Sequence, residues 1–360
     1  MANKFHISNR LFLILAITLN SILIMSCQNN KSDKKKNINT TEMQKYEWTP
    51  SACAPKYNPA QIHKGRFIFS NGESINIPSG HTLHQGWGKS GPTHIVGDDF
   101  KLIPSKLEIT WVSYLEKKFY KGIFNLPKEK ITKLFQNGYI DRLGKKETYS
   151  EINVGIAPGG IICVWLIGNG WTIEVARYKG DATNVSIEEF APSAIISMED
   201  YLNSVLAEDF NEETKAKMDL DNISFGKWDN YRKRYQWKPN IKYKKTGELK
   251  EIRITYYNGE SIYTIGSNEI LNQFQDYPIP DHIRMEWTDK NGNEFGSKIY
   301  FDEEEIIMAF KKVFEDLDHN QAELVLEIDK YNSDLTVILQ NELKAIHLKK
   351  ARIKIYETSN

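Results

Sequence analysis

The sequence predicts an α+β fold made of two degenerate repeats, each an antiparallel sheet with one packed helix, joined by a helical linker. Runs that alternate apolar and polar residues between Gly, Pro and Asn predict strands, and segments with apolar residues three and four apart predict helices. Three stretches of the first half also recur in order in the second half, which indicates a duplicated unit. They are residues 46–50 and 235–239, 66–75 and 253–262, and 103–131 and 279–307. The alternative, that unrelated strands and turns reuse Asn-Gly pairs and aromatic residues, stays open at this point.

Each repeat opens with a β-hairpin. Asn71-Gly72 in the first repeat and Asn258-Gly259 in the second each separate two short apolar segments. An Asn-Gly pair favours a type I′ turn, because both residues tolerate a positive φ. Alternating residues then predict strands at 107–113, 118–124, 283–288 and 298–301.

A helix and a meander complete each repeat. Pro127 suits a first helical turn and Gly138 can end that helix, whereas Asp302 and Glu305 form a capping box for the second helix. The apolar helix faces are Ile131, Leu134 and Phe135, and Ile306, Phe310, Val313 and Phe314. Further strands are expected at 152–156, 161–167, 171–178, 323–329, 335–339 and 343–356.

A helical linker is predicted between the repeats. Ser197 can cap one helix and Asn211 a shorter one. The aromatic residues that follow, Trp228, Tyr231, Tyr235 and Trp237, are expected to pack between the halves. The predicted domains are a signal peptide at 1–26, a lipidated Cys and disordered tether at 27–44, repeat one at 45–185, the linker at 186–232 and repeat two at 233–360.

Cys27 is predicted to be lipidated. A basic start with Lys4 and Arg10 precedes an apolar run at 11–25, and residues 24–27 (Ile-Met-Ser-Cys) fit a bacterial lipobox. A transmembrane helix would need about 20 mostly apolar residues, and this run is shorter and interrupted by polar residues. An ordinary cleaved signal fits less well, because it would need a small residue at the position of Ile24.

The predicted location is the cell envelope. Acyl chains on Cys27 would hold the protein to the membrane, and the polar tether cannot bury enough surface to fold. Gln28 in place of Asp after the thiol favours the outer membrane, on its periplasmic face. The membrane is therefore an expected partner through the N-terminal lipid anchor.

Charge and cysteine content narrow the classes of partner. The chain has a formal net charge of +0, and residues 1–44 carry six Lys or Arg against two acids, which leaves −4 for the remainder. No nucleic-acid partner is expected, because phosphate binding calls for a basic face.

Cys53 and Cys163 are candidates for a disulfide in an oxidising compartment, although Cys163 lies in an apolar run and fits a buried hydrophobic position equally.

Catalytic motifs are missing from the sequence. It contains no Gly-x-Ser-x-Gly elbow, no His-Glu-x-x-His or Cys-x-x-Cys pattern and no phosphate-binding loop after a strand. No catalytic residue and no cofactor are therefore predicted, and a non-enzymatic function is favoured.

A loop in the first repeat carries the candidate site. Residues 71–104 exceed their counterpart at 258–280 by eleven residues. The loop brings together His81, His84, His94, Trp87, Asp98 and Asp99. Functional groups concentrate on such loops, and three imidazoles with a carboxylate would suit zinc. The alternatives are histidines at the surface with Trp87 fixing the loop, or a site for a small ligand or partner, to which Trp171 could also contribute.

The residues also resemble a known family. The matching features are Tyr46-x-Trp48, Gly86-Trp87-Gly88, Trp111-Val112-Ser113, Leu126-Pro127 and the stretch from Trp228 to Trp237. Over residues 44–315 the chain resembles the bacterial lipoproteins grouped as domain of unknown function 2931. The resemblance implies an envelope location and a fold unit, and it implies no known reaction.

The sequence thus predicts a membrane-anchored envelope lipoprotein that binds a protein partner or a small ligand through this loop and a groove between the halves. An immunity or inhibitor role against a delivered toxin is one concrete version. Two alternatives stay open: a periplasmic metal-assisted hydrolase centred on the three histidines, and a structural component of the envelope.

Overall fold

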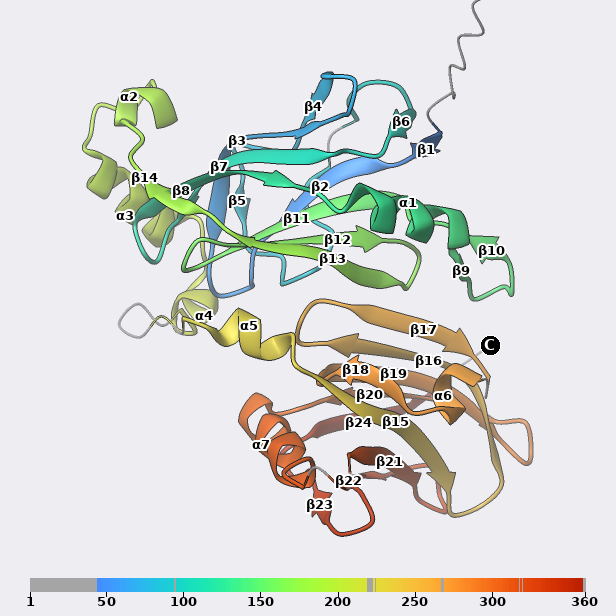
Figure 1. Ribbon diagram of the computed structural model, residues 1–360. Coiled ribbons are helices and arrows are strands. Elements are labelled where there is room, and N and C mark those ends of the chain that lie inside the picture. The colour runs from blue at the N-terminus through green and yellow to red at the C-terminus, as the bar shows by residue number, and fades with distance from the viewer. Residues whose placement is uncertain are drawn as a thin grey trace, which may run out of the picture. The chain divides into compact units, whose positions relative to one another are not determined.

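The computed structural model describes residues 44–93, 95–218, 223, 225–266, 269–316, 318 and 320–358 (Figure 1). The described chain is mixed α/β, mostly strands with seven short helices, and the strands form several open sheets. No described helix has the length and apolar character needed to cross a membrane.

Two sheets form the first half. One contains β2 (Thr49–Cys53), β11 (Glu151–Ala157), β12 (Ile161–Ile167) and β13 (Thr172–Lys179). The other contains β14 (Asp181–Thr183), β8 (Lys118–Asn125), β7 (Lys106–Ser113), β3 (Ala60–Ile68) and β4 (Ser74–Asn76), with β5 (Thr82–Leu83) paired to β3. The remaining elements are α1 (Lys128–Asn137) and the short pairs β1 (Lys45–Glu47) with β6 (Phe100–Leu102) and β9 (Tyr139–Ile140) with β10 (Lys146–Glu147).

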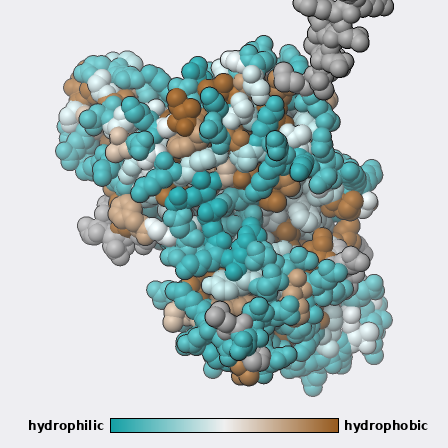
Figure 2. Space-filling model, in the orientation of Figure 1, coloured by the Kyte–Doolittle hydropathy of each residue, from teal (hydrophilic) through white to brown (hydrophobic). Residues whose placement is uncertain are grey.

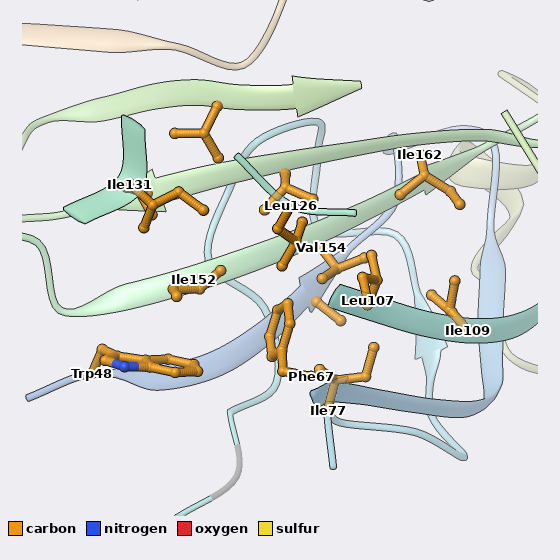
Figure 3. Packing of buried hydrophobic residues seen from close by; sticks show 14 of the residues in the cluster. Trp48, Phe67, Ile77, Leu107, Ile109, Leu126, Ile131, Ile152, Val154 and Ile162 are labelled. Atoms are coloured by element: carbon orange, nitrogen blue, oxygen red, sulfur yellow. The ribbon is translucent and has the colours of Figure 1, made fainter. Parts of the chain in front are cut away.

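The first core lies between these two sheets. In Figure 3, Ile152 and Val154 of β11 point toward Phe67 of β3 and Leu107 of β7. Ile131 of α1 belongs to the same cluster. Alternate residues of a strand face opposite sides of a sheet, so each strand gives one face to this core.

The second half has its own sheets and its own core. One sheet contains β18 (Gln275–Pro278), β15 (Arg234–Tyr243), β21 (Gln321–Ile328), β22 (Leu335–Gln340) and β23 (Ala345–His347). The other run contains β17 (Ser261–Ile265), β16 (Gly247–Tyr256), β19 (Pro280–Asp289), β20 (Glu294–Tyr300) and β24 (Arg352–Glu357). The cluster around Trp237 and Trp287 includes Phe310 of α7 (Glu303–Val313), and α6 (Glu269–Asn272) precedes β18.

Strand β13 pairs with β17 at Thr172 and Ser261, and this pairing joins the halves. The result is a nine-stranded sheet in the order β2-β11-β12-β13-β17-β16-β19-β20-β24. Four helices fall within the predicted linker: α2 (Ile187–Phe190), α3 (Met198–Glu208), α4 (Glu212–Lys215) and α5 (Lys227–Tyr231).

The predicted helix caps are present, with one difference. The side chains of Ser197, Asn211 and Asp302 each accept a hydrogen bond from the backbone N–H three residues later. The reciprocal half of the predicted capping box is wrong. The carboxylate of Glu305 accepts hydrogen bonds from the backbone N–H groups of Lys349 and Lys350 in the segment before β24. It therefore bonds to this segment and not back to the N–H of Asp302.

Long-range pairing corrects the expectation of purely antiparallel sheets. Strand β2 runs parallel to β11, and β15 runs parallel to β21. Parallel partners are necessarily far apart in sequence, so patterns of adjacent strands and turns do not reveal them. Each half also has two sheets where one was expected, and the predicted strand at 343–356 divides into β23 and β24, which belong to different sheets.

Two finer predictions are also wrong. The hairpin turns are not type I′, because positive φ occurs at Gly72 and Gly259 and not at the Asn before each. In both turns the glycine N–H donates to the carbonyl three residues earlier, as in a type I turn followed by a left-handed residue. The residue-by-residue match of 103–131 with 279–307 also fails at Ile123 and Ile299. Ile123 is 65% exposed, whereas Ile299 is 0% exposed.

Candidate functional site

Two of the three loop histidines lie within the described residues. His81 is exposed, and the ring of His84 packs edge-on against Phe210 with centroids 5.1 Å apart. His94 lies outside the described residues. Among the residues that the structure describes, no group of three or more His, Cys, Asp or Glu side chains is placed to hold a metal.

The loop acids lie at the surface. Asp98 and Asp99 are both exposed, and the Lys45 ammonium is 3.8 Å from a carboxylate oxygen of Asp98. A pair at such exposure contributes little to stability. These acids therefore mark a solvated end of the loop, beside the start of β1.

Trp87 fixes the loop to the sheet. It is buried, and its ring lies 4.8 Å from that of Trp165 on β12 and 5.1 Å from that of Trp228 on α5. Gly155 of β11 makes room for this packing, since a Cβ there would lie 2.4 Å from the Trp165 ring and 3.0 Å from the Trp87 ring. Trp228 and Tyr231 thus pack between the halves together with the loop, as predicted. The same prediction is wrong for Tyr235 and Trp237, which pack in the second core against Phe310 of α7.

We call the contact between the halves the seam: residues 86–88 and Trp165 of the first half against Asn258 and Gly259 of the second. A Cβ on Gly88 would lie 2.5 Å from the Cα of Gly259, and Trp165 Nε1 donates to the Asn258 carbonyl at 3.2 Å. Backbones can approach this closely only where both residues are glycine. The predicted groove between the halves is filled by backbone and aromatic rings along the seam.

Trp171 lies apart from Trp87. Residues 162, 164 and 166 of β12 face the first core, whereas Cys163 and Trp165 face the cluster that contains Trp87. Trp171 packs against the first core and stacks on Tyr139, with ring centroids 5.8 Å apart. The two tryptophans therefore lie on opposite faces of the sheet and do not line one pocket.

The predicted disulfide is wrong. Cys53 and Cys163 are both free and buried. Each is the cross-strand partner of Gly155, one from β2 and the other from β12, so β11 runs between them. Two strand spacings place their Cα atoms about 9–10 Å apart, and a disulfide requires less than about 7 Å. Burial raises the pKa of Cys53 to about 12, so this thiol stays protonated.

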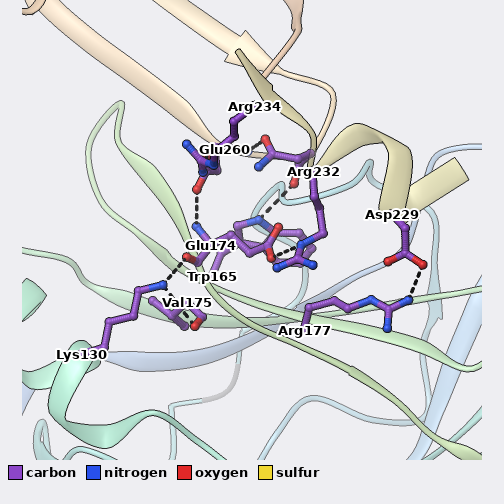
Figure 4. A network of polar contacts seen from close by, with 10 residues as sticks. Lys130, Trp165, Glu174, Val175, Arg177, Asp229, Arg232, Arg234 and Glu260 are labelled. Atoms are coloured by element: carbon purple, nitrogen blue, oxygen red, sulfur yellow. Dashed lines mark hydrogen bonds and ion pairs between the residues drawn. The ribbon is translucent and has the colours of Figure 1, made fainter. Parts of the chain in front are cut away.

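A polar network with two buried carboxylates and three exposed cations crosses between the halves (Figure 4). The carboxylate of Glu174 on β13 accepts from Arg232 Nε at 2.6 Å, and the Glu174 N–H donates to the Glu260 carboxylate at 3.0 Å. Arg234 pairs with Glu260, and Lys130 Nζ donates to the Glu174 carbonyl at 3.1 Å. The network ties α1, β13, the end of α5 and the second hairpin turn together.

Glu174 should make stability depend on pH. Burial raises its pKa, and the attraction of Arg232 opposes that shift. The folded chain therefore holds this proton more tightly than the unfolded chain, so the stability linked to Glu174 is fully present below the usual carboxyl pKa and declines as the pH rises through the folded value. We expect the unfolding free energy of the wild type to fall relative to that of Glu174→Gln as the pH rises above the ordinary carboxyl pKa of about 4. Urea unfolding at a series of pH values measures this, and a difference that stays constant would contradict it.

A second candidate site, which sequence reasoning missed, lies on the outward face of β17, β16, β19, β20 and β24. Ile252, Ile283 and Ile299 point into the second core, so the alternate residues face out. A hollow of about 340 Å³ lies on this face. It is lined by Glu251, Arg253, Tyr263, Arg284, Met285, Glu286, Lys298 and Tyr356.

Four cations lie side by side across this face. The strand register places Arg253 opposite Arg284, Arg284 opposite Lys298, and Lys298 opposite Lys354. We call these four residues the cationic row. Among the described residues, no carboxylate lies within 4.0 Å of their charged groups as an ion-pair partner. Rings flank the row, since Arg253 lies over Tyr263 and Lys298 Nζ is 5.8 Å from the centroid of Tyr356.

A pair of acids runs beside the cationic row. Glu251 is the cross-strand partner of Glu286, and Tyr263 donates its hydroxyl to Glu251. Partial burial raises the pKa of Glu286, and the nearby charge of Glu251 raises it further. Residues two apart on a strand are about 6.7 Å apart, so positive and negative rows lie next to each other on the sheet.

One cation on the sheet of β14, β8, β7, β3 and β4 is neutralised by its cross-strand partner. Arg66, which the sequence comparison matches to Arg253, lies opposite Glu108, and the two form an ion pair at 2.6 Å. The second half has Arg284 where the first has Glu108. Arg66 therefore faces an opposite charge across its strand pair, whereas Arg253 faces a like charge.

The described surface visible in Figure 2 is mostly hydrophilic, with apolar residues in small separate groups. Large exposed apolar residues such as Ile95, Ile123 and Ile195 come from different segments of the chain. Scattered exposure of this kind is ordinary for a folded protein.

The fold defines a mixed α/β protein of open sheets and short helices. Residues 28–226 match the family described as protein of unknown function (DUF2931), and this is more than half of the chain. The chain belongs to that family. A search of curated proteins and a search of solved structures found no match. The family match covers the first half and most of the linker, and it ends before the strands that carry the cationic row.

Proposed function

We propose that this protein is a lipid-anchored, non-enzymatic binding module of the cell envelope, on the periplasmic face of the outer membrane. Membership of the family supports no reaction, and the lipobox at residues 24–27 supports the anchor. The binding surface is the outward face of the second-half sheet, in place of the loop and the filled groove. The immunity or inhibitor version of this function would use the same surface.

The observation that carries the binding proposal is the cationic row. Four charges without ion-pair partners among the described residues lie beside a hollow and two aromatic rings. A rigid sheet positions them, and the seam and its polar network hold that sheet to the anchored half. Charged groups that are arranged to complement a partner steer its approach and fix its register.

We also propose that the two halves are degenerate copies of one unit. Each half has a parallel strand pair, two sheets around one core and a hairpin whose glycine takes a positive φ. Trp48 and Trp111 are buried in the first core, as Trp237 and Trp287 are in the second. In this view one copy was retained as the anchored scaffold and the other acquired the charged face.

Chemical cross-linking in intact cells tests the binding proposal. A tagged full-length chain is cross-linked, and the complexes in the envelope fraction are compared between wild type and the double variant Arg284→Glu, Lys354→Glu. The control is Lys106→Glu, Lys121→Glu, which makes the same charge change at exposed residues of β7 and β8. We expect a complex that the first variant loses and the control keeps.

A further inference from the structure

The cationic row is unfavourable for the isolated fold. Three consecutive cross-strand pairs, Arg253 with Arg284, Arg284 with Lys298, and Lys298 with Lys354, place like charges directly opposite each other. Such pairs are destabilising. The Arg66–Glu108 pair shows that a single residue change would relieve one of them. The positive charge of the cationic row therefore does not stabilise the fold.

The spacing of the row indicates the shape of its counterpart. Neighbouring strands are about 4.8 Å apart, so the four cations span about 14 Å across three spacings. A helix rises about 5.4 Å per turn, so carboxylates one turn apart span about 16 Å over three turns. Same-face residues of an extended chain are about 6.7 Å apart and would span about 20 Å, which matches the row less well.

The neighbouring acids indicate the class of partner. A membrane surface or a polyanion presents negative charge alone. It would be attracted by the cations but repelled by Glu251 and Glu286. A protein surface can present both signs in adjacent stripes. The rows of opposite sign on this sheet therefore favour a protein partner over a lipid or phosphate polymer.

We infer that the cationic row binds an acidic helix of a partner protein, laid across strands β16, β19, β20 and β24 with one carboxylate per turn and basic residues on the adjacent stripe. The inference rests on the proposed binding function and names the chemistry of the partner. The carboxylates pair with the cations, and the basic stripe faces Glu251 and Glu286.

Two labelled helical peptides of identical composition test this. One carries Glu along one stripe and Lys along the adjacent stripe, and the other has the same residues in scrambled positions. Fluorescence anisotropy with the full-length protein in detergent measures both affinities. We expect the patterned peptide to bind at least tenfold more tightly than the scrambled one. Arg284→Glu, Lys354→Glu should remove this preference, and Lys106→Glu, Lys121→Glu should retain it.

The variant should remain folded, because a glutamate at position 284 recreates opposite Arg253 the pairing seen between Arg66 and Glu108. Thermal unfolding of the same samples checks this. Equal affinities for the two peptides, or no binding of either, would overturn the inference. Tighter binding of polyphosphate or of phosphatidylglycerol vesicles than of the patterned peptide would also overturn it. If cross-linked complexes in cells still depend on the sheet face in that case, the proposed function stands and the acidic helix does not.

Discussion

Replacing Gly259 with alanine should cost about 1–3 kcal/mol more stability than the same change at Gly72. The two glycines have nearly the same backbone, with φ of 87° and 89°. An alanine in this region is strained at both positions by roughly 1–2 kcal/mol. A Cβ at Gly72 meets nothing within 4 Å, whereas one at Gly259 would lie 2.7 Å from the Cα of Gly88. The difference between the variants therefore isolates the seam.

Urea unfolding of the two full-length variants measures this difference. Gly80→Ala and Gly88→Ala form a second matched pair, because both glycines have positive φ and a Cβ at Gly80 is also unopposed. The alanines at 88 and 259 should both be the more damaging member of their pair. Equal losses at Gly72 and Gly259 would mean that the halves are not held in close backbone contact.

Replacing Cys27 with alanine should move the protein from the membrane fraction to the soluble fraction almost completely. Each buried methylene of an acyl chain contributes about 0.8 kcal/mol of membrane affinity, so loss of two or more chains removes nearly all retention. Fractionation of cells and intact mass of the purified protein measure the effect. Cys53→Ala is the control, because it removes a thiol and leaves residues 24–27 intact. Unchanged mass and membrane retention in Cys27→Ala would contradict the anchor.

Local features of the fold could be predicted from the sequence. Ser197, Asn211 and Asp302 start helices because each needs only its own side chain and an N–H three residues away. The run at 161–167 is a strand, and its alternate residues face two apolar clusters. These outcomes depend on residues that lie close together in the sequence.

Features that depend on distant partners could not be predicted. The pairing of β2 with β11 joins residues about 100 positions apart, and the residues of neither segment indicate which segment pairs with it. Trp87 was expected to fix its loop or to contribute to a site, and its actual partners, Trp165 and Trp228, come from two other segments. The cationic row exists only through the register of four strands, so its members do not form a motif along the chain.

The account depends most on the outward sheet face being a binding surface in the envelope. The most direct test is the yield of cross-linked complex in intact cells for wild type, for Arg284→Glu, Lys354→Glu and for Lys106→Glu, Lys121→Glu, at equal amounts of each protein. The account predicts that the yield falls at least tenfold in the first variant and stays within twofold of wild type in the second. A yield that is the same in all three proteins would show that the partner is held elsewhere and would contradict the account.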